Sequence, residues 1–272
     1  MTIKTRNRLN ISLFFFSLFF LAVNVAILLI SLYKYPYLLM PDASALTGKN
    51  LITQDNPLIV LISLFFQIIY VCITSFMLYR VFEKTQATDI SFFFLFLVAL
   101  LTNSFRIWIL LFSMANTYSN LLIFCGNTVL FSKLLVPVSL FFSVAKSSVD
   151  QRQDLEKNIF ILLLGCIFFS QIIPLNTANI CINFEVDYSF RNVIRISSML
   201  ILLATLIALF FNNKSRYYTQ LTTIGLALIC TGTIILLNCT NILKLILSFV
   251  FLLTGNIMYL KELHKQYLWN DV

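Results

Sequence analysis

Residues Ile11–Tyr33 read ISLFFFSLFFLAVNVAILLISLY and contain no charged side chain. A helix that crosses the roughly 30 Å hydrocarbon core of a bilayer needs about 20 consecutive, mostly apolar residues. The stretch therefore predicts a transmembrane helix. A cleavable signal peptide has a shorter apolar region of about 7–15 residues, so we expect this helix to remain in the protein as its first span.

Seven further apolar runs follow along the chain. They are Leu58–Tyr79, Ile90–Phe112, Leu121–Ala145, Asn158–Leu175, Asn192–Phe211, Leu221–Leu237 and Ile242–Leu260. The chain is 60% hydrophobic and only 11% charged, whereas soluble domains carry about 25% charged residues. No segment between the runs reaches the roughly 50 residues that an independent domain usually needs. We therefore predict an all-α integral membrane bundle of eight transmembrane helices, in one domain over residues 1–272.

Basic residues between the runs gather on alternate segments. One set is Lys4, Arg6, Arg8, Arg80, Lys84, Lys146, Arg152, Lys157, Lys214, Arg216, Lys261 and Lys265; the other is only Lys34, Lys49 and Arg191. The positive-inside rule places the first set in the cytoplasm. Both termini are then cytoplasmic, and a bacterial inner membrane is the simplest location. The net charge of +8 fits this orientation and contact with anionic membrane lipid, and we expect no nucleic acid partner.

Ionisable residues within the spans are the first places to seek function, because each costs about 2.5–3.5 kcal/mol at a helix centre. All of them are basic: Arg106, Lys133, Arg195 and Lys244. Arg195 and Lys244 lie within about one turn of the outer ends of their helices, so their side chains can extend to the headgroups. Arg106 follows Thr102 and Asn103 on one polar face, which favours an orientation toward the bundle interior.

Lys133 is the deepest of these cations, about 12 residues from either end of its span. Its side chain cannot reach the headgroups, since a helix rises 1.5 Å per residue. Pro137 cannot donate a hydrogen bond to the Lys133 carbonyl, so we expect a kink there. The first interpretation is a polar, positively lined cavity that opens outward, with Arg106, Asn103 and Asn127 as further ligand-binding candidates. The alternative is a structural Lys133 bonded to neighbouring carbonyls.

A cavity with cations and no buried carboxylate suits an anion better than a cation, which normally needs acidic residues at depth. We therefore predict a binding or sensory membrane module for an anionic or amphiphilic ligand, a small molecule or a lipid headgroup, reached from the outer side. Such a module needs a protein partner in the membrane for its output. A transporter or lipid-translocating protein that uses the kinked helix is the alternative, and an intramembrane enzyme ranks third.

Catalytic and metal-binding patterns are missing from the sequence. The single histidine is His264, in the last segment, so no His-based triad or His metal site can form within the spans. No Gly-x-Ser-x-Gly elbow or phosphate-binding loop occurs. We expect neither a cofactor nor a metal.

Two further features leave alternatives open. Cys181 and Cys239 both fall in outer segments, where an oxidising environment permits a disulfide. The seventh span carries small residues at four-residue spacing, with glycines nearby, and small residues let helix backbones approach closely in lipid. This small-residue face, Thr223, Ala227 and Thr231, serves either a dimer contact or packing within one bundle.

Overall fold

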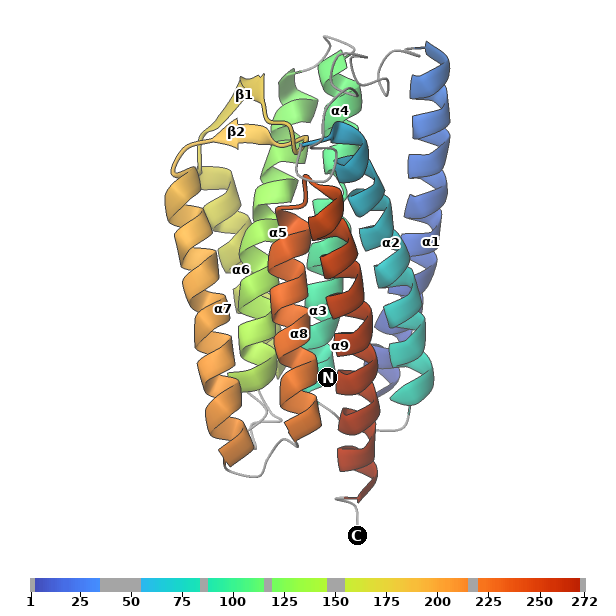
Figure 1. Ribbon diagram of the computed structural model, residues 1–272, viewed down its shortest axis with the longest axis vertical. Coiled ribbons are helices and arrows are strands. Elements are labelled where there is room, and N and C mark those ends of the chain that lie inside the picture. Colours follow the sequence, from blue (N-terminus) through green and yellow to red (C-terminus); the bar gives the residue numbers. More distant parts are fainter. Residues whose placement is uncertain are drawn as a thin grey trace.

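The computed structural model describes residues 3–34, 55–83, 88–114, 119–145, 155–214 and 220–269. Within these ranges, eight spans are long and apolar enough to cross a membrane, which confirms the predicted multi-pass helical bundle (Figure 1). The elements in chain order are α1 (Ile3–Lys34), α2 (Pro57–Val81), α3 (Thr88–Asn103), α4 (Arg106–Met114), α5 (Ser119–Ala145), α6 (Leu155–Ile172), β1 (Leu175–Ile180), β2 (Val186–Tyr188), α7 (Arg191–Lys214), α8 (Gln220–Leu237) and α9 (Ile242–Trp269).

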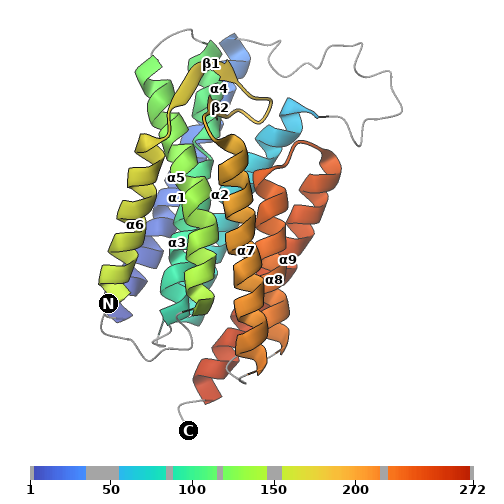
Figure 2. The same ribbon diagram turned by 90° about the vertical axis from the view of Figure 1, so that its left-hand side faces the viewer.

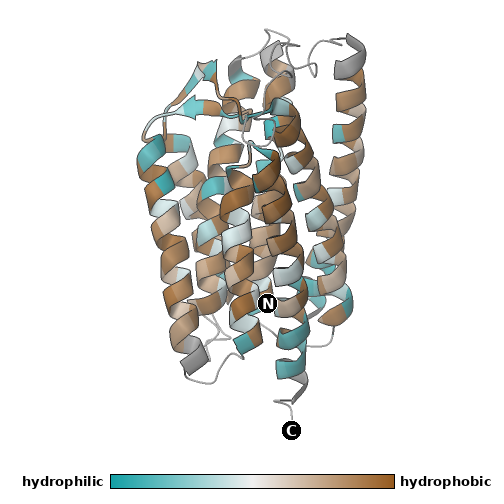
Figure 3. Ribbon diagram, viewed as in Figure 1, coloured by the Kyte–Doolittle hydropathy of each residue, from teal (hydrophilic) through white to brown (hydrophobic). Residues whose placement is uncertain are grey.

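The bundle has one central span and several peripheral ones. In the span Asp89–Leu110, which covers most of α3 and the first part of α4, 67% of its most apolar 18-residue stretch is buried, against 17% in α6. Peripheral helices turn large apolar side chains such as Phe168 and Phe210 outward, and brown hydrophobic residues cover the length of the helices in Figure 3. This distribution is typical of a protein whose outer surface is solvated by lipid.

The two ends of the bundle differ. The beginning of α1 and the end of α9 lie at one end, which we call the terminal end, and the strands β1 and β2 lie at the other, the hairpin end (Figures 1 and 2). An even number of spans places both termini on the same side. Which side of the membrane this is stays a prediction from the distribution of Lys and Arg.

α8 and α9 pack closely because glycines face each other across their interface. A Cβ atom built on Gly225 would lie 2.7 Å from Tyr259 N, and one built on Gly255 would lie 2.7 Å from Gly225 O. Gly232 likewise approaches Leu252 of α9. These glycines therefore serve packing within the bundle, and a dimer contact through Thr223, Ala227 and Thr231 stays a prediction.

For the third span we predicted one continuous helix over Ile90–Phe112, but the structure has two helices there, α3 and α4. It is interrupted at Ser104 and Phe105, where Ser104 N donates to Leu101 O (3.1 Å) and Phe105 N donates to Thr102 O (3.2 Å). These bonds to the third preceding residue tighten the chain into a 3₁₀-like turn. Neither Gly nor Pro marks the position. α4 begins directly after this turn, at Arg106.

The predicted outer loop Pro174–Arg191 contains an antiparallel hairpin. Leu175 pairs with Tyr188 and Ile180 with Val186, with an irregular register between. The hairpin lies close to α5, because a Cβ on Gly126 would meet Leu175 Cδ1 at 2.8 Å. Gly126 therefore leaves room for Leu175 of the hairpin against α5.

Candidate functional site

Glu185 lies at the centre of the site. The turn before it is closed by Phe184 N donating to Cys181 O (2.9 Å) and by Cys181 N donating to Glu185 O (2.8 Å). Phe184 adopts a left-handed conformation, with φ of 56°. The turn directs Glu185 into the bundle, where 2% of its side chain is exposed.

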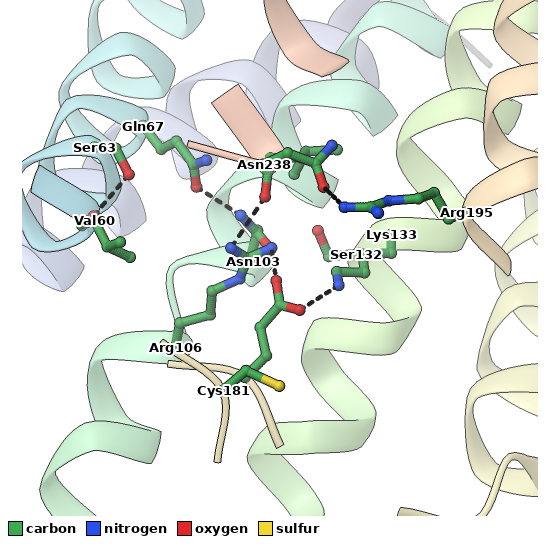
Figure 4. Close-up of polar contacts among 12 residues, drawn as sticks. Val60, Ser63, Gln67, Asn103, Arg106, Ser132, Lys133, Cys181, Arg195 and Asn238 are labelled. Atoms are coloured by element: carbon green, nitrogen blue, oxygen red, sulfur yellow. Dashed lines mark hydrogen bonds and ion pairs between the residues drawn. The ribbon is translucent and has the colours of Figure 1, made fainter. Parts of the chain in front are cut away.

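Three helices supply cations to this carboxylate. Arg106 Nη2 lies 2.6 Å from Glu185 Oε1, and Lys133 Nζ lies 2.5 Å from Oε2. Arg191 Nη2, at the start of α7, is 3.8 Å from Oε2. Figure 4 shows Arg106 and Lys133 directed from different helices toward the same space. We call Glu185, Arg106 and Lys133 the buried ion cluster.

Our expectation that these cations face no carboxylate is wrong. Glu185 belongs to a segment outside every apolar run, 52 residues from Lys133, and reaches the cations because the hairpin folds back over the bundle. Buried charges need a partner, since desolvation is costly. A signal for this lay in the sequence: Glu185 sits between the apolar residues Phe184 and Val186, and both of these neighbours are buried in the structure.

The cluster ties several elements together. Lys133 Nζ also donates to Tyr188 Oη (3.1 Å) and lies 5.0 Å from the centre of that ring, a distance compatible with a cation–π interaction. Arg106 Nη1 donates to Leu237 O (3.3 Å). A cation at the last residue of α8 is favourable, because a helix C-terminus carries partial negative charge. The cluster therefore joins α4, α5, α8 and the hairpin.

Burial and the neighbouring cations act in opposite directions on Glu185. Burial raises the pKa of its carboxyl, but the charges of Arg106, Lys133 and Arg191 and the hydrogen bond from Lys133 together hold that pKa below its ordinary value. Glu185 is therefore ionised at neutral pH, and the cluster is an ion pair network.

This shift predicts an acid-sensitive fold. Because the pKa of Glu185 is lower when folded, the cluster contributes stability above the unfolded value of about 4.3 and loses it as pH falls through the folded pKa. The melting temperature of the wild type in detergent should therefore contain an acid-induced loss below about pH 4.3 that the Glu185→Gln variant lacks. Identical pH dependence in the two proteins would contradict this assignment.

The other predicted residues do not all gather here. Asn103 Nδ2 donates to Gln67 Oε1 (2.9 Å) in the bundle interior, three residues before Arg106. Asn127 instead donates to Gln171 Oε1 of α6 (3.0 Å) and is not in the lining of either cavity described below, so its role in ligand binding stays a prediction. α5 continues through Pro137, and the kink stays a prediction.

A narrow cavity adjoins the cluster between α7 and α8, with α5 behind it. Its volume is about 50 Å³, and we call it the α7–α8 cleft. Its lining is Lys133, Pro137, Tyr188, Arg191, Ile194, Arg195, Ser198, Met199, Leu202, Ile234, Leu237 and Asn238. The cations lie toward the hairpin end, and Met199, Leu202 and Ile234 lie deeper, while the apolar Ile194 and Leu237 lie at the level of the cations.

A second, larger cavity of about 330 Å³ lies at the hairpin end, and we call it the vestibule. Its lining is Asp55, Cys181, Ile182, Asn183, Arg191, Arg195, Asn238, Thr240 and Lys244. It shares Arg191, Arg195 and Asn238 with the cleft. The sequence had indicated only that Arg195 and Lys244 reach toward headgroups. That both line one cavity with Arg191 depends on how α7 and α9 are arranged at this end.

The two candidate disulfide cysteines are free thiols in the structure. Arg191 Nη1 donates to Cys181 Sγ (3.0 Å). Cys239 is buried, and burial raises the pKa of its thiol to about 11. A raised pKa disfavours the thiolate that disulfide exchange requires. Pairing of the two under oxidising conditions stays a prediction.

Comparison with known proteins gives no relative from which to argue. No family model matches the chain, and neither a curated protein nor a solved structure matches it significantly. Among the described residues, no group of three or more His, Cys, Asp or Glu side chains is placed to hold a metal ion.

Proposed function

We propose that this protein is a membrane binding module for an anionic amphiphile, whose headgroup occupies the vestibule and whose tail enters the α7–α8 cleft. One observation carries the proposal. Apart from Ile194, which lies between the two arginines, the α7 residues that line the cleft change from Arg191 and Arg195 through Ser198 to Met199 and Leu202. This change from charged to apolar side chains takes place over about 16 Å of helix. An amphiphile has the same order, with a charged headgroup followed by an apolar tail.

The other two walls follow the same gradient. On α8 and its end, Asn238 lies toward the vestibule and Ile234 lies deeper, and on α5, Lys133 precedes Pro137. Three independent helices thus place polar groups at one depth and apolar groups at the next. A ligand that is polar throughout would leave the deeper walls without a matching partner.

The seam between α7 and α8 is suited to opening. α7 packs mainly against α5 and only lightly against α8, whereas α8 packs most extensively on α9. In the closed state the cleft has room for one or two waters, since each occupies about 30 Å³ in the liquid. Admission of a tail therefore requires α7 to separate from α8, toward the lipid.

The distribution of Lys and Arg supports an outward-facing hairpin end, so the ligand would enter from the outer side. A sensory role would need a protein partner in the membrane to carry its output. A second candidate function is lipid translocation. It is favoured by Pro137 at the inner end of the cleft, where α5 lacks one backbone hydrogen bond.

Arg195→Gln tests the binding function, because Arg195 is exposed and joins both cavities. In detergent-purified protein, native mass spectrometry should show phosphatidylglycerol bound in preference to phosphatidylcholine with the same chains. Arg195→Gln should weaken phosphatidylglycerol binding about tenfold or more, since a hydrogen bond to a charged group contributes about 1.5–3 kcal/mol and each 1.4 kcal/mol changes the affinity about tenfold.

Arg80→Gln is the matched control. Arg80 lies in the last turn of α2, at the terminal end, and stacks on Phe76 at 5.0 Å, so its loss should leave lipid binding unchanged. Equal binding by wild type and Arg195→Gln would contradict the proposal. Binding accompanied by movement of labelled lipid between leaflets of proteoliposomes would favour translocation over sensing.

A further inference from the structure

The vestibule has an excess of positive charge. Arg191, Arg195 and Lys244 line it, together with one carboxylate, Asp55. Arg195 Nη2 donates to the amide oxygen of Asn238 (3.2 Å), and Lys244 Nζ donates to the hydroxyl of Thr240 (3.1 Å). Within the described part of the chain, neither cation forms an ion pair with a carboxylate.

Glu185 cannot neutralise this excess of positive charge. Its two oxygens are already held by Arg106 and Lys133, and Arg191 is no closer than 3.8 Å. Around the cluster and the vestibule, the described cations Arg106, Lys133, Arg191, Arg195 and Lys244 outnumber the carboxylates Glu185 and Asp55 by three. A single negative charge on a ligand would therefore leave most of the excess in place.

Helix ends add to the positive field. The vestibule borders the beginnings of α2, α7 and α9, at Asp55, Arg191 and Thr240 respectively. Helix N-termini carry partial positive charge and favour acidic side chains. None of these three helices has an acidic residue in its first turn, and α7 and α9 carry Arg191 and Lys244 there instead. The positive charges of these side chains and helix ends repel one another unless an anion binds in the vestibule.

From this cavity and its charges we infer that the headgroup is a phosphomonoester, which carries up to two negative charges and three acceptor oxygens. The inference rests on the proposed amphiphile binding and names its headgroup. Phosphate oxygens accept hydrogen bonds from guanidinium and ammonium groups and from backbone N–H groups at helix N-termini. A carboxylate or a phosphodiester carries only one charge. Inorganic phosphate shares the headgroup chemistry but has no tail to enter the cleft.

The test compares phosphatidic acid, phosphatidylglycerol and phosphatidylcholine with identical acyl chains, each titrated against the full chain in detergent. At pH 8 phosphatidic acid should bind about tenfold more tightly than phosphatidylglycerol. The advantage should disappear toward pH 5, because the second ionisation of a phosphomonoester lies near pH 6.

Lys244→Gln should reduce the preference for phosphatidic acid while phosphatidylglycerol still binds, and Lys244→Arg should keep this preference. Lys244 is exposed, and an unchanged melting temperature verifies that the variants fold.

The outcomes separate the inference from the function on which it rests. The first outcome is equal affinity for phosphatidic acid and phosphatidylglycerol, with both weakened by Arg195→Gln. This result would overturn the inference of a phosphomonoester headgroup and would leave the proposed amphiphile binding in place. No preference for either anionic lipid over phosphatidylcholine would overturn both proposals. Inorganic phosphate that binds as tightly as phosphatidic acid would show that the tail contributes nothing and would overturn the lipid source.

Discussion

Glu185→Gln should lower the free energy of unfolding by about 3–5 kcal/mol, the cost of removing one partner from a buried ion pair. The substitution keeps the shape of the side chain but leaves the buried cations Arg106 and Lys133 without their carboxylate. Melting in detergent measures the loss, and faster hydrogen exchange over residues 175–188 should accompany it, because the ions hold the hairpin on the bundle.

The control is Asp187→Asn on the same hairpin. Asp187 is only half-buried, and its carboxylate accepts from the adjacent Tyr188 N at 3.1 Å, so the change should cost far less. Lys133→Met should also cost less than Glu185→Gln, because Glu185 keeps Arg106. The double variant Glu185→Gln/Lys133→Met should recover part of the loss, since it removes one uncompensated cation. Simple addition of the two single losses would show that Glu185 and Lys133 are not coupled.

Substitutions at Gly225 should disrupt the pairing of α8 with α9. Its added Cβ would meet the backbone N of Tyr259 at 2.7 Å, and a backbone atom cannot move aside as the end of a flexible side chain can. Gly225→Ala should therefore cost about 1–3 kcal/mol, the usual penalty of overpacking. Gly225→Leu should prevent the close approach of the two helices and leave little folded protein in a detergent melting or size-exclusion assay.

Gly165→Ala on α6 provides the comparison. A Cβ there would meet nothing within 4 Å, and alanine in a helix is favoured over glycine by about 0.5–1 kcal/mol. The variant should be as stable as the wild type or slightly more stable. If Gly225→Ala melts at the same temperature as Gly165→Ala, close packing at Gly225 does not support the fold.

The sequence by itself determined the class of fold. The length and apolarity of each run require a spanning helix whatever its neighbours are, because the bilayer offers no hydrogen-bond partner to an unpaired backbone. It also indicated that Arg106 faces inward, since Asn103 shares its side of the helix. Lys133 could be recognised as a cation beyond reach of the headgroups from its position alone. These conclusions depend only on local composition and helical geometry.

Tertiary structure decided what those cations contact. Glu185 reaches Lys133 and Arg106 only because the hairpin packs on α5 at Gly126, and nothing in the spacing of the chain specifies that docking. The vestibule likewise exists only where α7 and α9 begin near each other and bring Arg195 and Lys244 to one cavity. A buried charge requires a counter-charge but does not specify where in the chain it lies, so the partner follows from long-range packing.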